Sequence, residues 1–206
     1  MLLLVSSVLL AACSEGSSDV TTVTDDQSLS RFDVPNGWHT YELAELSTLE
    51  QLPFDAEYQS FSFPAITSVG FDGSPVSDVT QLNSSIADAD YPIGAASVRQ
   101  VGDVERDFLS RAMLSQSVVP YRTLANADEL QKEDFSFGSG FDGVRVLFSF
   151  ESETGSDLGV GYLISVSDPD DSRIYSIVAG CNRECFIANQ DTITKVVDSW
   201  LVNKKG

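Results

Sequence analysis

The feature that most constrains the fold lies in the last third of the chain, where apolar and polar residues alternate. The alternation runs through residues 144–150 and again through 160–166, and residues 174–179 form a third apolar segment. A period of two residues is typical of a β-strand with one buried face. The polar links at 151–157 and 167–172 are short enough for hairpins. The sequence therefore predicts a three-stranded antiparallel meander.

A helix is predicted directly after the meander. Its apolar stripe comprises Phe186, Ile187, Gln190, Ile193, Val197 and Trp200, which fall at helical spacing. An amphipathic helix buries its apolar face against another element, so we expect this helix to lie across the meander. An antiparallel β-sheet packed against helices is an α+β fold.

The earlier part of the folded body is predicted to open with a hairpin. Phe32 and Val34 alternate with polar neighbours, as in a strand, and residues 38–43 form a second apolar segment. The Pro-Asn-Gly sequence at 35–37 between them is a strong turn signal, since Asn and Gly tolerate positive φ.

Two helices are predicted in the middle of the chain. Asp103 is the expected N-cap of a helix that continues to Met113 and buries Val104 and Phe108. Asn126 is the expected cap of a second, shorter helix.

The first thirteen residues resemble an export signal with a lipid attachment site. Residues 1–12 are uncharged, and Leu10-Ala11-Ala12-Cys13 reads as a bacterial lipobox, in which a cysteine thiol receives the lipid. The run lacks the basic residues that normally begin a signal peptide, and it is shorter than the roughly 20 residues that span a bilayer. We expect residues 1–12 to be removed and Cys13 to carry acyl chains. The alternative is an ordinary buried or free cysteine.

Composition then divides the rest of the chain in two. Residues 13–30 are dominated by Ser, Thr, Asp, Gly and Glu, which cannot bury enough apolar surface to fold, so they are predicted to be a disordered tether. Residues 31–206, about 175 residues, suit a single α+β domain.

The charge of the chain excludes one class of partner. Twelve basic residues face 31 acidic ones, giving a net charge of −19. Nucleic acid binding requires clustered Lys and Arg, so no nucleic acid partner is expected. The same charge disfavours an electrostatic grip on anionic lipid, which leaves the acyl anchor to hold the protein at a membrane.

The other two cysteines, Cys181 and Cys185, are close in sequence. In an exported protein such a pair is most simply a disulfide. A zinc site would need four ligands, and the only histidine, His39, is far away in sequence. A redox pair usually has Cys-x-x-Cys spacing, and this pair has one residue more.

Taken in order, these features resemble the Mog1/PsbP-like superfamily, particularly its actinobacterial cell-surface lipoprotein branch. The resemblance rests on the lipobox and tether, on the strand and Pro-x-Gly-Trp sequence at 32–38, and on the meander leading into a helix that ends in Asp-Ser-Trp at 198–200. It covers residues 31–201 and implies an α/β sandwich, with an antiparallel sheet between helices. Because that family consists mostly of binding and assembly proteins, it implies no catalytic residues.

A search for reactive groups leaves few candidates. A Ser-His-Asp triad would have to use His39, and a glycan or ester hydrolase could use two of the many carboxylates. Asp168, Asp170 and Asp171 could hold Ca²⁺, which prefers oxygen ligands, although Asp-Pro-Asp-Asp is also ordinary turn chemistry. No cofactor is predicted.

The sequence thus predicts a lipid-anchored protein at the extracytoplasmic face of a bacterial cell membrane, with a non-catalytic domain that binds another envelope protein or a small ligand. The alternatives are a carboxylate-dependent envelope hydrolase and a Ca²⁺-dependent adhesion or assembly module.

Overall fold

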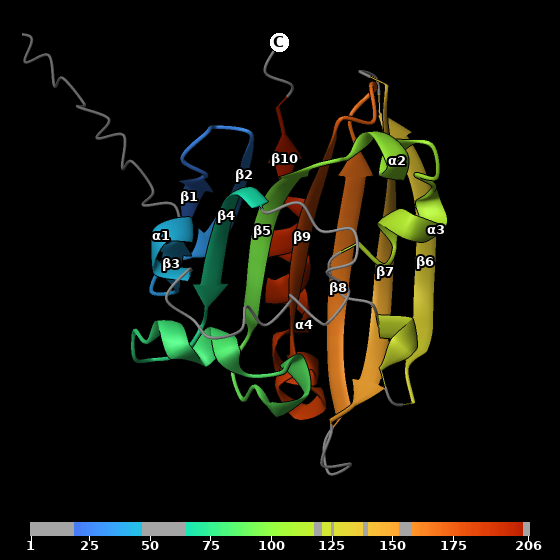
Figure 1. The fold of residues 1–206 in the computed structure, drawn as a ribbon. Coiled ribbons are helices and arrows are strands. Elements are labelled where there is room, and N and C mark those ends of the chain that lie inside the picture. The colour runs from blue at the N-terminus through green and yellow to red at the C-terminus, as the bar shows by residue number, and fades with distance from the viewer. Residues whose placement is uncertain are drawn as a thin grey trace, which may run out of the picture.

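The computed structural model describes residues 19–46, 65–117, 121–124, 126–137, 140–152 and 158–203. Their strands form two antiparallel sheets (Figure 1). The large sheet has seven strands, in the order β3 (His39–Glu42), β4 (Ala65–Asp72), β5 (Ile93–Gln100), β9 (Arg173–Asn182), β8 (Leu158–Ser167), β7 (Phe141–Glu151) and β6 (Asp128–Phe137). The small sheet has three, in the order β1 (Val20–Thr24), β2 (Ser30–Pro35) and β10 (Leu201–Val202).

One long helix and several short ones complete the described structure. The long helix is α4 (Arg183–Asp198). The short helices are α1 (Leu43–Leu46), η1 (Val79–Asn83), η2 (Ile86–Asp88), α2 (Asp103–Arg106), α3 (Arg111–Leu114) and η3 (Tyr121–Thr123). None of the helices in the described ranges is long and apolar enough to cross a membrane.

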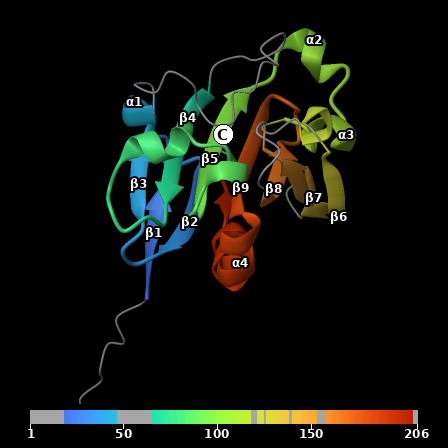
Figure 2. The same ribbon diagram turned by 90° about the horizontal axis from the view of Figure 1, so that it is seen from below.

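The large sheet lies between two layers (Figures 1 and 2). On one face, which we call the α4 face, Tyr162 of β8 packs on Phe186 of α4 with ring centroids 5.8 Å apart. The small sheet covers the same face further along, where Phe32 of β2 lies 5.3 Å from Phe71 of β4. The short helices cover the opposite face, which we call the short-helix face.

On the short-helix face, a glycine in the sheet lets a short helix approach the strands closely. A Cβ added to Gly180 of β9 would lie 2.4 Å from the carbonyl oxygen of Val160 and 3.1 Å from the side chain of Ile86 in η2. Nearer the other edge, Tyr121 of η3 stacks on Phe148 of β7 at 5.3 Å. Both contacts hold short helical segments against the sheet.

The predicted meander and closing helix are confirmed. β7, β8 and β9 pair in antiparallel order, with Val146 opposite Leu163 and Leu163 opposite Val178. All three side chains are fully buried. Tyr162 and Ile164, which point to the other face, are buried as well, so the meander is covered on both faces and not on one face as the alternation predicted. The following helix, α4, crosses β8 and β9.

The stripe assigned to α4 is partly wrong. Phe186, Ile193 and Val197 are buried, but Ile187 is 69% exposed and Gln190 is also exposed. The helix buries Cys185 and Val196 instead, because the disulfide brings the first turn of the helix against the sheet.

The predicted opening hairpin is also wrong. Gly37 adopts a positive φ of 92°, so the turn forms as expected. However, β2 pairs with β1 and β10 in the small sheet, whereas β3 pairs with β4 in the large sheet. The turn therefore carries the chain from one sheet to the other.

The tether predicted for residues 13–30 is wrong from Val20 onwards. Val20–Thr24 forms β1, and its sequence of Val and Thr consists of β-branched residues that favour strands. The turn after it is closed by Asp25, whose carboxylate accepts hydrogen bonds from the backbone N–H groups of Gln27 and Leu29 at 2.9 and 3.1 Å. Cys13 and the leader lie outside the described residues.

The helix predicted to run from Asp103 to Met113 forms as two short pieces. Gly102 occupies the N-cap position of α2, and Ser110 caps α3 by accepting the N–H of Met113. Asn126 has a positive φ of 46° and precedes the strand β6, so the second predicted helix is absent from this part of the described chain.

Candidate functional site

His39 lies on β3 directly opposite Asp72 of β4. Within the described ranges its buried Nε2 has no hydrogen-bond partner. The carboxylate of Asp72 is already occupied, because it accepts the hydroxyl of Tyr41 at 2.6 Å and the backbone N–H of Ser74 at 2.8 Å. The Asp72 carboxylate therefore holds Tyr41 and the loop that follows β4.

The Tyr41 hydroxyl joins two parts of the chain. It donates to Asp72 and accepts the backbone N–H of Asp78 at 2.9 Å. Burial of the phenol, reinforced by the hydrogen bond to Asp72, raises the pKa of Tyr41 to about 12. The phenol is therefore neutral at physiological pH, and its role is to hold the loop between β4 and η1.

The three candidate Ca²⁺ ligands stand in the turn between β8 and β9. Asp168 is buried, and its carboxylate accepts the backbone N–H and hydroxyl of Ser172, both at 2.6 Å, and the N–H of Arg173 at 3.2 Å. Asp171 takes a positive φ of 50° in the same turn. No group of three potential metal ligands occurs among the described residues. Asp168 thus caps the turn, as Asp-Pro-Asp-Asp chemistry predicts.

A row of four serines crosses the short-helix face, one on each of four neighbouring strands. Ser68 of β4 lies opposite Ser97 of β5, Ser97 opposite Ser176 of β9, and Ser176 opposite Ser165 of β8. The hydroxyls of Ser165 and Ser176 are 2.7 Å apart, and that of Ser117, just after α3, lies 2.7 Å from Ser165.

This serine row does not form a nucleophile site in the described structure. Its hydroxyls bond to one another and to backbone carbonyls, such as those of Ala96 and Tyr175. A serine becomes nucleophilic when a general base removes its proton, and hydroxyls and carbonyls do not do so. The row explains how polar residues are accommodated in the middle of the sheet.

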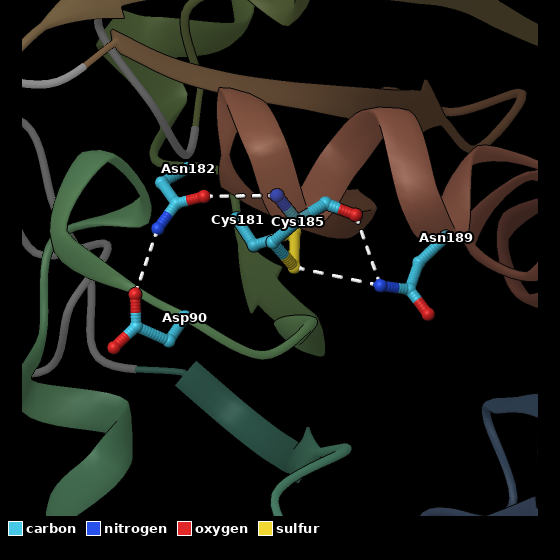
Figure 3. Close-up of a disulfide and its surroundings, with 5 residues drawn as sticks. All are labelled: Asp90, Cys181, Asn182, Cys185 and Asn189. Atoms are coloured by element: carbon cyan, nitrogen blue, oxygen red, sulfur yellow. Dashed lines mark hydrogen bonds between the residues drawn. A yellow bond between two sulfur atoms is a disulfide. The ribbon is translucent and has the colours of Figure 1, made fainter.

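Cys181 and Cys185 form the predicted disulfide, which joins β9 to the first turn of α4 (Figure 3). Asn182 between them is the N-cap of the helix: its side-chain oxygen accepts the N–H of Cys185 at 2.9 Å, while its amide donates to Asp90. Asn189 donates to the carbonyl of Cys185 at 2.9 Å. Both cysteines are buried, so the disulfide stabilises the junction between β9 and α4.

The segment of residues 103–108, which we call the α2 tip, is held by an inward-facing ion pair. Arg99, at the end of β5, donates two hydrogen bonds to the carboxylate of Glu105, at 2.5 and 2.9 Å. The Glu105 side chain is only 4% exposed, and that of Arg99 is 19% exposed. A two-point pair of this kind fixes orientation as well as position.

The α2 tip is also joined to the turn between β8 and β9. The Nε of Arg106 donates to the carbonyl of Asp171 at 3.3 Å, and the N–H of Val101 donates to the carbonyl of Ser172 at 2.9 Å. Figure 1 shows α2 beside the upper ends of these strands.

With Glu105 turned inward, the α2 tip presents apolar side chains to solvent. Val104 is 66% exposed and Phe108 is 68% exposed. Both were predicted to lie in the core, so the sequence pattern gave the wrong face of this segment. The sequence pattern did not signal the correct face, since Glu is rarely buried unless it is paired.

Comparison with known proteins gives structural matches only. No protein-family model and no curated protein sequence matches the chain. Among solved structures it is similar to LpqN of Mycobacterium tuberculosis, described as involved in cell envelope biogenesis. The two share 12% identity over 92% of this chain and 88% of LpqN, with a TM-score of 0.50.

Two further structures cover nearly the whole chain. Cyanobacterial PsbP from Synechocystis has 9% identity, covering 94% of this chain and 99% of PsbP, with a TM-score of 0.47. The Ran-binding protein Mog1p of Saccharomyces cerevisiae has 10% identity, covering 90% of this chain and 96% of Mog1p, with a TM-score of 0.49. At such identities the likeness concerns the fold alone. The predicted α+β fold, an antiparallel sheet packed against helices, is confirmed by the strand order and agrees with the likeness to LpqN.

Proposed function

We propose that this protein is an envelope lipoprotein, held at the extracytoplasmic face of a bacterial membrane by acyl chains on Cys13, and that its single domain binds another protein without catalysing a reaction. The observation that carries the anchor is the lipobox sequence from Leu10 to Cys13 at the end of an uncharged run. Two or more acyl chains give stable attachment, whereas one chain does not.

The disulfide supports an extracytoplasmic location. Structural disulfides persist in oxidising compartments and are rare in the cytosol, and Cys181 and Cys185 form one in the folded body. The likeness in fold to LpqN, whose described role is in the cell envelope, agrees with this placement.

The arrangement of reactive groups supports binding over catalysis. In the described structure the only histidine lies beside an occupied carboxylate, and the buried serines bond to one another and to carbonyls. By contrast, the α2 tip displays a partly apolar, anchored surface, which is a common feature of protein-interaction sites.

The anchor is tested by metabolic labelling of the full chain in a bacterial host with an alkyne-bearing palmitate. We expect wild type to carry the label and to sediment with membranes, and Cys13→Ala to lose both properties. The matched control replaces Cys181 and Cys185 together with Ala and should remain labelled, since those thiols lie in the folded body. A Cys13→Ala chain that still carries the label would contradict the proposal.

A further inference from the structure

The α2 tip carries two exposed apolar residues close together in sequence. Val104 and Phe108 are four residues apart and each is about two-thirds exposed. The remaining exposed large apolar residues of the described chain are isolated in sequence: Val20, Val76, Tyr91, Leu130, Ile187 and Leu201. Single exposed apolar residues are normal on soluble proteins, but a pair on one turn is a local patch.

The patch is carried on a fixed support. Glu105, between the two apolar residues, is locked to Arg99 beneath it, and Arg106 bonds to the neighbouring turn. The N–H of Phe108 donates to the carbonyl of Glu105 at 3.0 Å, which continues the helical turn. A surface that is already ordered loses little conformational freedom when it binds.

The charges around the patch are mainly negative. Asp103 and Asp107 are exposed and flank the apolar residues, and the side chain of Asp103 is 96% exposed. The basic side chain of the tip, Arg106, is 43% exposed and lies 3.6 Å from the carboxylate of Asp103, while Glu105 is paired with Arg99. Since the whole chain carries −19, anionic lipid, nucleic acid and a second copy of the chain are all repelled from this surface.

We propose that the α2 tip docks a basic segment of another protein, in which an apolar side chain contacts Val104 and Phe108 while neighbouring Lys or Arg side chains face Asp103 and Asp107. The inference deepens the proposed function by naming its binding surface and the chemical class of its partner. It rests on the binding role but not on the lipid anchor.

The test measures binding of a fluorescent peptide of alternating Lys and Leu to the full chain in a detergent with an uncharged headgroup. We expect Phe108→Ser to weaken binding about tenfold and Val104→Ser to weaken it several-fold, as for residues at the centre of an interface. Ile187→Ser, which alters an equally exposed residue on α4, is the matched control and should bind like wild type. A Phe108→Ser chain with unchanged affinity, or an Ile187→Ser chain weakened as much, would overturn the proposal.

The charge requirement has its own pair of variants. Asp103→Asn combined with Asp107→Asn should weaken binding and reduce its dependence on salt. The control removes two exposed charges from α4, by Glu184→Gln with Asp191→Asn, and should change affinity less. Equal effects of the two double variants would mean that only the total charge matters, and would overturn the assignment to this surface.

Two further measurements exclude other occupants. Phe108→Ser should leave unchanged both the binding of the protein to phosphatidylglycerol vesicles and its sedimentation-equilibrium mass. A loss of vesicle binding would assign the patch to a lipid surface, and a loss of dimer would assign it to a second copy, and either result would overturn the proposal. The Cys13→Ala chain should bind the peptide like wild type, so a failed anchor and a failed docking surface give different results.

Discussion

Glu105 helps to set how the segment from Asp103 to Phe108 faces the sheet. If Val104 and Phe108 were buried instead, Arg99 would lose the carboxylate that it holds at two points. Leaving one member of a buried ion pair without its partner costs about 3–5 kcal/mol, and exposing two apolar side chains at about 1.5–3 kcal/mol each costs about 3–6 kcal/mol. The two costs are similar in size, so the ion pair acts together with the hydrogen bond from Arg106 to the carbonyl of Asp171, which holds the same orientation.

The Arg99–Glu105 pair is therefore expected to contribute more to stability than other pairs. We predict that Arg99→Met lowers the free energy of unfolding by about 2–3 kcal/mol, which is below the value for fully buried pairs because Arg99 is partly exposed. The control is Arg111→Met, whose pair with Asp142 is 42% and 56% exposed at the two side chains and should contribute less than about 1 kcal/mol. Urea unfolding measures both variants. Similar losses in the two would contradict this account of the segment.

Tyr41 gives a second test, through pH. Its pKa is raised from 10.0 to about 12 in the folded protein, mainly by burial and then by Asp72. The folded state therefore favours the protonated phenol, and this contribution is fully present below pH 10 and is lost as the pH rises towards about 12. A rise of the pKa from 10.0 to about 12 corresponds to about 3 kcal/mol.

We predict that stability falls between pH 10 and about 12 in wild type and falls less steeply in Tyr41→Phe, which has no phenol proton to lose. Urea unfolding across this window gives the comparison, and tyrosinate absorbance reports the titration. Parallel curves for the two proteins would show that Tyr41 does not control this transition.

At the scale of elements, α4 is oriented by its N-terminal attachment. The disulfide and the Asn182 cap hold the first turn against the end of β9, and the rotation of the helix follows from there. Cys185 thus takes a place on the buried stripe that the sequence pattern had assigned to Ile187. A local periodicity of 3.6 residues identifies a helix well, but it leaves the centre of a wide stripe uncertain.

The orientation of α4 predicts opposite outcomes for two isoleucines of the same helix. Ile193 is fully buried, so Ile193→Ala should cost about 2–4 kcal/mol through lost contacts and a cavity. Ile187 is 69% exposed, and Ile187→Ala should change stability by less than about 0.5 kcal/mol. Both values come from thermal or urea unfolding. A large loss for Ile187→Ala would mean that the helix is rotated from the orientation described.

For the whole molecule, the predictable part of the fold was the part built from neighbours in sequence. The meander, α4 and the disulfide each depend on segments that follow one another, so periodicity and spacing suffice. The pairing of β10 with β2, where Leu201 lies opposite Arg31, and that of β3 with β4 join segments far apart in sequence and leave no local pattern, which is why 32–43 was predicted to be a simple hairpin. The β1–β2 hairpin is local, but it was missed because its Ser, Thr and Asp content predicted a tether.

The same limit applies to the candidate site. The serine row exists only because four strands are in register, and no property of Ser68 or Ser176 taken alone indicates it. The α2 tip was missed for a different reason: Val104 and Phe108 do have helical spacing, but Glu105 between them pairs with Arg99 on another element, and local spacing does not show this. The role of Asp168 in the turn could be predicted from the sequence, because its hydrogen-bond partners are residues a few positions further along the chain.

The arrangement of the small sheet has a mechanical consequence. A pull on the chain ahead of Val20 reaches β1 first, and β1 is a mostly exposed outer strand joined to β2 by a tight turn. The load would open this ladder bond by bond before it reached the aromatic contact between Phe32 and Phe71. Under tension β1 can thus detach first and lengthen the chain while the seven-stranded sheet stays intact.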